Sequence, residues 1–154
     1  MTLFKTLAVC ALALCAIACG PSFTAVAPPG FVELEDQVAY DYRATNADGL
    51  VFAVREIDHE PKGTIDFWTR AVENHMRQRG GYALLGSHDV KSADGVPGKQ
   101  LRFGHDEQAT PHLYHVTIFV TDDSIVLFEA GGTKDLMTRH ADQLDWALKN
   151  FRVE

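Results

Sequence analysis

Two segments indicate the fold most clearly: 113-LYHVTIFV-120 and, after a three-residue polar turn, 124-SIVLFEA-130. Both segments have the length and the β-branched and aromatic composition of strands. In the first strand Ile118 points to one side and Phe119 to the other, so both of its faces are apolar. A strand that is apolar on both faces is covered on both sides. We therefore expect an antiparallel hairpin in a sheet with helices on both faces.

Other segments of the chain also have strand patterns. The residues 46-NADG-49 form a strong turn signal, and the loop 92-SADGVPG-98 separates two later segments. Most connections are too short for parallel crossovers, so the sheet is expected to be mainly antiparallel. The remaining strands are expected at residues 31–35, 38–44, 50–57, 82–91 and 99–105.

A first helix is predicted between Thr64 and the pair Gly80-Gly81. Thr64 is a good N-cap, and Asp66 lies in the first turn, where the helix dipole favours an anion. Glycine after the last turn is the usual end of a helix. The apolar residues that follow at helical spacing form the expected buried face, namely Ile65, Trp68, Val72 and Met76.

A second helix is predicted near the C-terminus. Gly131-Gly132 is expected to end the last strand, after which Thr133 or Asp135 caps the helix. Its buried stripe is expected to be Met137, Ala141, Leu144, Leu148 and Phe151. Together the patterns predict an α/β (α+β) fold with a mainly antiparallel sheet of about six or seven strands, flanked by two helices as an α/β/α sandwich.

The order of these elements resembles the PsbP-like fold, which the PsbP proteins of photosystem II share with the Ran-binding Mog family and the bacterial DcrB-type lipoproteins. The resemblance covers residues 31–153. It rests on the early strands, the helix led by 64-TID-66, the 94-DGVPG-98 segment before 101-LRF-103, and the C-terminal helix ending at 150-NF-151. It implies a non-enzymatic accessory or binding domain without a cofactor, and it transfers no active-site residue.

The N-terminus is expected to be a signal peptide spanning residues 1–18. Lys5 supplies its positive charge, and the apolar run 7–18 is too short to span a bilayer, which takes about 20 residues. The segment 16-AIAC-19 resembles a bacterial lipobox, although that motif prefers Leu where Ala16 stands. The resemblance implies that Cys19 becomes lipidated. The alternative is an ordinary secretory signal cut after Ala18, with Cys19 incidental.

This N-terminus predicts a location on the exported side of a cell membrane, with acylated Cys19 in the lipid bilayer. Gly20, rather than Asp, follows the cysteine and favours the outer membrane, facing the periplasm, in a double-membrane bacterium. Residues 19–30 are expected to be the lipidated cysteine and a tether, reaching at most about 45 Å. Residues 31–154 are expected to form one domain.

The chain is acidic, with 14 Lys and Arg against 21 Asp and Glu, and a formal net charge of −7. Removal of residues 1–18 takes away Lys5 alone and leaves −8. This balance argues against binding to nucleic acid, which requires a basic face, and against a polybasic contact with anionic lipid. We expect the acidic domain to stand off the membrane surface.

Histidines near one short loop are the candidate metal ligands. If strands 99–105 and 113–120 pair, His105 and His112 lie at the base of one hairpin, and Glu107, or alternatively Asp106, adds a carboxylate. These groups suit zinc or copper, or a small-molecule site. His112 and His115 differ by three positions on a strand and face opposite sides. The alternative is a loop with solvated histidines and no ligand.

Catalytic motifs are incomplete in this sequence. His59-Glu60 begins like the H-E-x-x-H metalloprotease motif, but Pro61 breaks the helix that the motif requires, and no second histidine follows. The segment 131-GGTK-134 lacks the full P-loop spacing, and no G-x-S-x-G sequence occurs. The sequence therefore predicts a non-catalytic binding or accessory domain that contacts a protein of the cell envelope.

Overall fold

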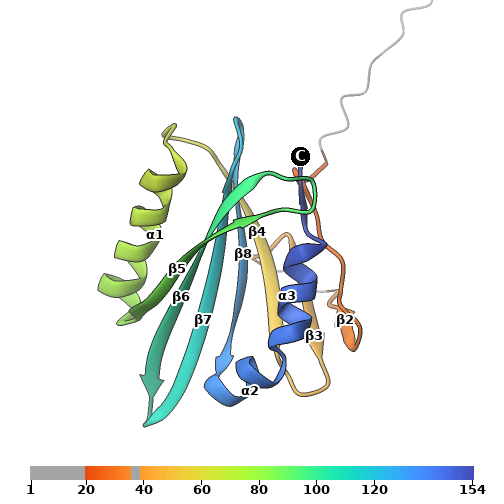
Figure 1. Ribbon diagram of the computed structural model, residues 1–154, viewed down its shortest axis with the longest axis vertical. Helices are drawn as coiled ribbons and strands as arrows, with labels where there is room; N and C mark the ends of the chain where they lie inside the picture. Colours follow the sequence, from red (N-terminus) through yellow and green to blue (C-terminus); the bar gives the residue numbers. More distant parts are fainter. Residues whose placement is uncertain (1–19, 36–38) are drawn as a thin grey trace, which may run out of the picture.

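A seven-stranded antiparallel sheet forms the body of the computed structural model, which describes residues 20–35 and 39–154 (Figure 1). Its strand order is β2-β3-β4-β8-β7-β6-β5, and a two-stranded sheet pairs β1 with β9. This confirms the predicted antiparallel α+β fold. The strands are β1 (Phe23–Thr24), β2 (Phe31–Glu33), β3 (Tyr42–Asn46), β4 (Val51–Asp58), β5 (Ala83–Lys91), β6 (Pro97–Glu107), β7 (Thr110–Val120), β8 (Ser124–Thr133) and β9 (Arg152–Val153).

The β7–β8 hairpin is longer than the sequence suggests. The prediction that Gly131-Gly132 ends the last strand is wrong, because Gly131 still pairs with Tyr114 and Gly132 with Leu113. A Cβ atom on Gly131 would lie 2.5 Å from Cδ2 of Tyr114. Glycine at this position therefore allows the Tyr114 ring to approach the backbone closely. It does not end the strand.

Helix α1 (Ile65–Gly80) begins and ends where the sequence predicts. The Thr64 hydroxyl accepts a hydrogen bond from the Phe67 N–H at 3.2 Å, and Gly81 adopts the left-handed conformation with φ of 66°. The helix packs on one face of the sheet, where Trp68, Val72 and Met76 contact a core of buried side chains. That core consists of Leu101, Phe103, Val116, Ile118 and Ile125.

The predicted second helix is two helices, α2 (Lys134–Arg139) and α3 (Ala141–Lys149), with His140 at the junction. The His140 Nε2 atom lies 2.8 Å from Oδ2 of Asp48, which ties the junction to the β3–β4 turn. Met137 and Leu144 are buried as expected, but Ala141 is exposed and Ala147 is buried instead. The break between the helices shifts the buried stripe.

A second core lies between α3 and the opposite face of the sheet, and aromatic rings dominate it. Phe52 stacks on Phe128 at a centroid distance of 5.1 Å, and Phe128 meets Phe151 edge-on at 5.4 Å. Phe151, at the end of the chain, also contacts Phe119 and is fully buried. The two cores confirm the prediction of helices on both faces.

The helices are offset across the sheet. Helix α1 covers β5, β6 and β7 on one face, whereas α2 and α3 pack over β7, β8 and the β3–β4 side on the other (Figure 1). Each face consequently keeps a part that no helix covers: β3, β4 and β8 on the α1 side, and β5 and β6 on the α3 side. Both uncovered parts hold pockets.

The start of the chain corrects the predicted domain boundary. β1 pairs with β9, and Phe23 is buried with its ring stacked on Phe151 at 5.7 Å. Residues 23–24, placed in the tether by their Pro- and Gly-rich surroundings, thus belong to the folded domain. The signal peptide 1–18 and Cys19 lie outside the described residues. Within the described ranges no helix is long and apolar enough to cross a membrane.

Candidate functional site

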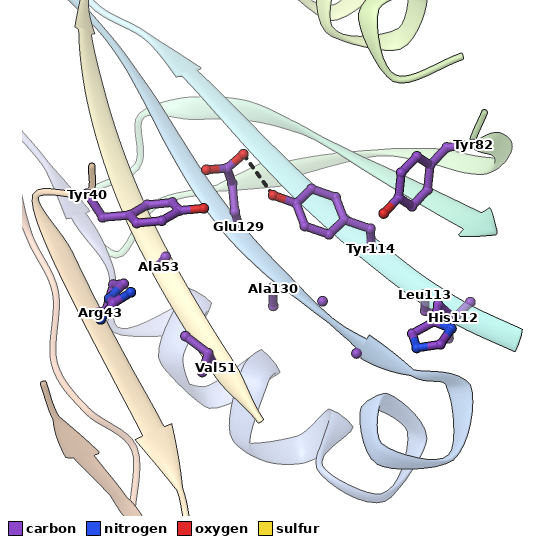
Figure 2. A pocket seen from close by; sticks show the side chains of 12 residues that line it. Tyr40, Arg43, Val51, Ala53, Tyr82, His112, Leu113, Tyr114, Glu129 and Ala130 are labelled. Atoms are coloured by element: carbon purple, nitrogen blue, oxygen red, sulfur yellow. Dashed lines mark hydrogen bonds between the residues drawn. The ribbon is translucent and has the colours of Figure 1, made fainter. Parts of the chain in front are cut away.

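A pocket of about 300 Å³ lies on the uncovered part of the α1-side face, over β4, β7 and β8 (Figure 2). Three tyrosines, an arginine, a histidine and a buried glutamate contribute its polar lining. The backbone of Gly131 and Gly132 forms part of the wall. The polar lining residues are Tyr40, Arg43, Tyr82, His112, Tyr114 and Glu129.

Glu129 is the centre of this pocket. Its carboxylate accepts hydrogen bonds from Nη2 of Arg55 at 2.7 Å and from the Tyr114 hydroxyl at 3.0 Å. The strand register explains the arrangement, because Glu129 lies between Ala53 of β4 and Val116 of β7. The Glu129 side chain is only 8% exposed, whereas that of Arg55 is 40% exposed. A nearly buried anion is thus held by a cation that reaches solvent.

The pKa values of the two hydrogen-bond partners of Glu129 are shifted. Burial, together with the adjacent Glu129 carboxylate, raises the pKa of Tyr114, so its hydroxyl remains a donor across the physiological range. The hydrogen bond to Glu129 raises the pKa of Arg55, although burial opposes it. Tyr40 and Tyr114 lie on either side of Glu129 in Figure 2. The Arg55 guanidinium carbon also lies 5.1 Å from the centroid of the Tyr40 ring.

A largely apolar pocket of about 360 Å³ lies between α1 and the sheet and shares Glu129 with this site. Arg55 and Glu129 contribute to its lining, together with side chains of α1, β4, β7 and β8. Ile57 is 37% exposed on this surface. The apolar wall consists of Ile57, Trp68, Ala71, Val72, Met76, Val116, Ile125 and Leu127. We call the two pockets, which share Glu129, the β4–β8 groove.

The β4–β8 groove combines hydrogen-bonding groups and an ion pair with an adjacent apolar wall. Sites of this composition bind ligands or protein segments: the apolar surface supplies affinity and the few polar groups fix orientation. Sequence reasoning missed Arg55, Tyr114 and Glu129, because only strand register brings them together. One local signal was present, since Glu129 is a lone carboxylate inside an otherwise apolar strand.

The structure brings the predicted metal ligands partly together. His105 and His112 are direct register partners, and Nε2 of His112 lies 4.0 Å from Oε2 of Glu107. The other ring nitrogen of His112 lies 2.9 Å from the Thr110 carbonyl oxygen, and the His105 ring contacts Tyr82. In the part of the chain that the structure describes, no group of three or more His, Cys, Asp or Glu residues is placed to hold a metal ion. The metal site stays a prediction.

His59, the first residue of the incomplete H-E-x-x-H segment, is buried and links three segments. Its Nδ1 lies 2.7 Å from the Thr121 carbonyl oxygen, and its Nε2 accepts a hydrogen bond from the Gly63 N–H at 2.8 Å. This histidine joins the end of β4 to the β7–β8 turn and to the segment that precedes α1. The contact explains the burial of His59 without a ligand.

Comparison with known proteins identifies the fold. No protein-family model matches the sequence, and no curated protein matches it. Among solved structures, LpqN of Mycobacterium tuberculosis, described as involved in cell envelope biogenesis, superposes with a TM-score of 0.72 at 10% identity, over 85% of this chain and 82% of LpqN. The cyanobacterial PsbP protein (CyanoP) of Synechocystis sp. PCC 6803 gives 0.60 at 11% identity, over 86% and 87% of the two chains. The chain has a PsbP/Mog-like fold.

A third structure extends the same comparison. The Ran-binding protein Mog1p of Saccharomyces cerevisiae gives a TM-score of 0.58 at 13% identity, over 86% of this chain and 90% of Mog1p. The coverage shows that the PsbP/Mog-like fold accounts for nearly the whole described chain. These matches confirm the resemblance inferred from the element order and the 94-DGVPG-98 segment. At such low identity they establish the fold alone.

Proposed function

We propose that this protein is an exported lipoprotein, anchored through acylated Cys19, whose PsbP/Mog-like domain binds a partner protein of the cell envelope through the β4–β8 groove and performs no catalysis itself. The 16-AIAC-19 segment supports the anchor. The fold supports the accessory role, since LpqN is described as involved in cell envelope biogenesis and Mog1p as Ran-binding. Such a domain acts by holding its partner at the membrane.

The observation that carries the binding role is the Arg55–Glu129–Tyr114 cluster beside a largely half-buried apolar wall. A nearly buried carboxylate costs stability unless it is compensated, and here the compensating Arg55 is 40% exposed, where a partner can contact it. Ile57 and the half-buried side chains of α1 add apolar surface next to the ion pair. The groove therefore offers an apolar contact surface and a polar group that can fix the orientation of a bound partner.

The position of β1 sets how close the domain lies to its anchor. Four residue steps separate Cys19 from buried Phe23, a reach of at most about 14 Å. Ser22 is already held, because its N–H donates to Oε2 of Glu56 at 3.1 Å and its carbonyl oxygen accepts from the Glu154 N–H at 2.8 Å. An acylated Cys19 would thus place the β1–β9 end next to the bilayer, closer than the sequence suggested.

Two measurements test the proposal. Replacement Cys19→Ser in the full chain is expected to move the protein from the membrane fraction to the soluble fraction, and a variant that stays in the membrane would contradict the anchor. For the groove, Ile57→Lys is expected to abolish co-purification of the partner that the wild-type chain retains. Val26→Lys, at another exposed apolar residue, is the matched control and is expected to retain the partner. Equal loss in both variants would contradict a role of the groove.

A further inference from the structure

A third pocket lies on the opposite face of the sheet, at the part of β5 and β6 that α3 leaves uncovered. Its volume is about 370 Å³. Its lining combines basic side chains of β5, β6 and β7 with an apolar part from β5, β7, α2 and α3. Its lining consists of Leu85, Gly86, His88, Arg102, Leu113, His115, Met137, Thr138 and Ala141. We call this site the basic pocket.

Three adjacent strands each supply one basic side chain to this pocket. Arg102 of β6 pairs in register with His115 of β7 on one side and with Gly86 of β5 on the other. His88 lies two residues beyond Gly86, and a Cβ atom on Gly86 would lie 3.2 Å from Nε2 of His88. The His88 ring therefore lies against Gly86, the residue that pairs with Arg102. Register alone brings His88, Arg102 and His115 to one place.

A buried relay positions Arg102. Its Nε–H donates to Oε1 of Gln100 at 2.8 Å, and Nε2 of Gln100 donates to Oγ1 of Thr117 at 3.3 Å. Gln100 and Thr117 are both buried, so the relay is fixed within the sheet. Among the described residues no carboxylate forms a salt bridge with Arg102. Its side chain is exposed, so its Nη donors are accessible to solvent and to a bound group.

The charge of Arg102 acts on the neighbouring His115. Burial, followed by the charge of Arg102, lowers the pKa of His115 to about 4; His88 adds to this effect, and Asp145 of α3 opposes it. The imidazole is consequently neutral at physiological pH and retains one N–H donor. In a chain with a net charge of −7, this cluster is a local exception. A bound anion would offset the charge of Arg102 and accept a hydrogen bond from the neutral imidazole.

We propose that the basic pocket binds an organic monocarboxylate, with the carboxylate on Arg102 and His115 and the apolar body against Leu113 and the exposed Leu85. The planar guanidinium presents paired N–H donors that match a carboxylate. The apolar side of the pocket distinguishes such a ligand from an inorganic anion, which would leave that surface in contact with water. The site lies on the other face of the sheet from the β4–β8 groove, so it is independent of the proposed partner contact.

Isothermal titration calorimetry of the purified full chain, with benzoate as the probe, tests the proposal. Benzoate is expected to bind at least tenfold more tightly than inorganic phosphate, because only benzoate contacts the apolar side. Arg102→Met is expected to weaken benzoate binding by about ten- to a hundredfold, the usual effect of losing a charge-assisted hydrogen-bonded pair. Arg70→Met, at an exposed position on α1, removes the same charge and is expected to leave the affinity unchanged.

An NMR titration of the wild-type chain with benzoate provides a test that does not depend on the folding of any variant. Benzoate is expected to shift the resonances of the Arg102 side chain, the His115 ring and the Thr138 amide. An absence of binding, phosphate binding as tight as benzoate binding, or shifts confined to other residues would overturn the proposal. A weakening by Arg70→Met equal to that by Arg102→Met would also overturn it, because it would show a nonspecific effect of charge.

Discussion

The ion pair between Arg55 and Glu129 should be coupled more strongly than its surface position suggests. Replacement Arg55→Met keeps the length and most of the apolar stem of the side chain but removes the charge. Glu129, only 8% exposed, would then retain the Tyr114 hydroxyl as its remaining described side-chain partner. Glu129→Gln and the double variant complete a double-mutant cycle, which isolates the energy of the pair from the contact of Arg55 with Tyr40.

The exposure of the two partners sets the expected magnitude. Breaking a fully buried pair costs about 3–5 kcal/mol, and an exposed pair contributes about 0–1 kcal/mol. Because Arg55 is 40% exposed, water can solvate part of this site, and we expect Arg55→Met to cost about 2 kcal/mol. For a chain of this size that loss lowers the Tm by about 4–8 °C. The coupling energy from the cycle should be about 1–2 kcal/mol.

Urea and thermal unfolding followed by circular dichroism measure these values. The exposed Arg77–Glu73 pair, at 3.3 Å on α1, provides the control, and Arg77→Met is expected to cost less than about 0.5 kcal/mol. Equal losses for Arg55→Met and Arg77→Met would refute the reasoning. An additive cycle would refute it as well, since it would mean that Arg55 and Glu129 do not stabilise each other in solution.

The remaining predictions concern packing, pH and metal. Gly131→Ala is expected to cost about 1–3 kcal/mol in urea unfolding, because the new methyl group meets the Tyr114 ring, whereas Gly132→Ala, which meets a flexible side-chain end at 3.3 Å, should cost less. Burial opposes ionisation of Glu56, but hydrogen bonds from Ser124 and Ser22 outweigh it and lower the Glu56 pKa. The stability that ionised Glu56 contributes is therefore fully present above the unfolded pKa of about 4.3 and is lost as the pH falls through the lower pKa of the folded state. The stability difference between wild type and Glu56→Gln should accordingly shrink on acidification, and a constant difference would contradict this. Zinc and EDTA are expected to leave the Tm of the full chain unchanged, whereas a zinc-dependent rise removed by His112→Ala would establish the site at His105, Glu107 and His112.

Much of the fold could be predicted from sequence because its determinants are local. The alternation in β7 and β8 shows two apolar faces without any knowledge of neighbouring strands. Thr64 and Gly81 mark the ends of α1 through the hydrogen-bonding and conformational needs of a helix terminus. The break at His140 and the two-residue β1–β9 pair were missed, because neither has a periodic pattern and β1 depends on a partner more than a hundred residues away.

The candidate site could not be predicted in the same way. Arg55, Tyr114 and Glu129 belong to three strands, and only the register of β4, β8 and β7 brings their side chains into contact. The histidines drew attention because histidine is a common ligand, yet His59 is held by backbone groups within the core. A lone carboxylate in an apolar strand was the more informative signal.

Photo-crosslinking in living cells tests the central claim most directly. A photoreactive residue replaces Ile57 in the β4–β8 groove, and a second full chain carries it at Val26 as the matched control. The proposed function predicts one reproducible crosslinked envelope protein from position 57 and none above background from position 26. No crosslink at position 57, or the same crosslinked proteins from both positions, would contradict a partner-binding role for the groove.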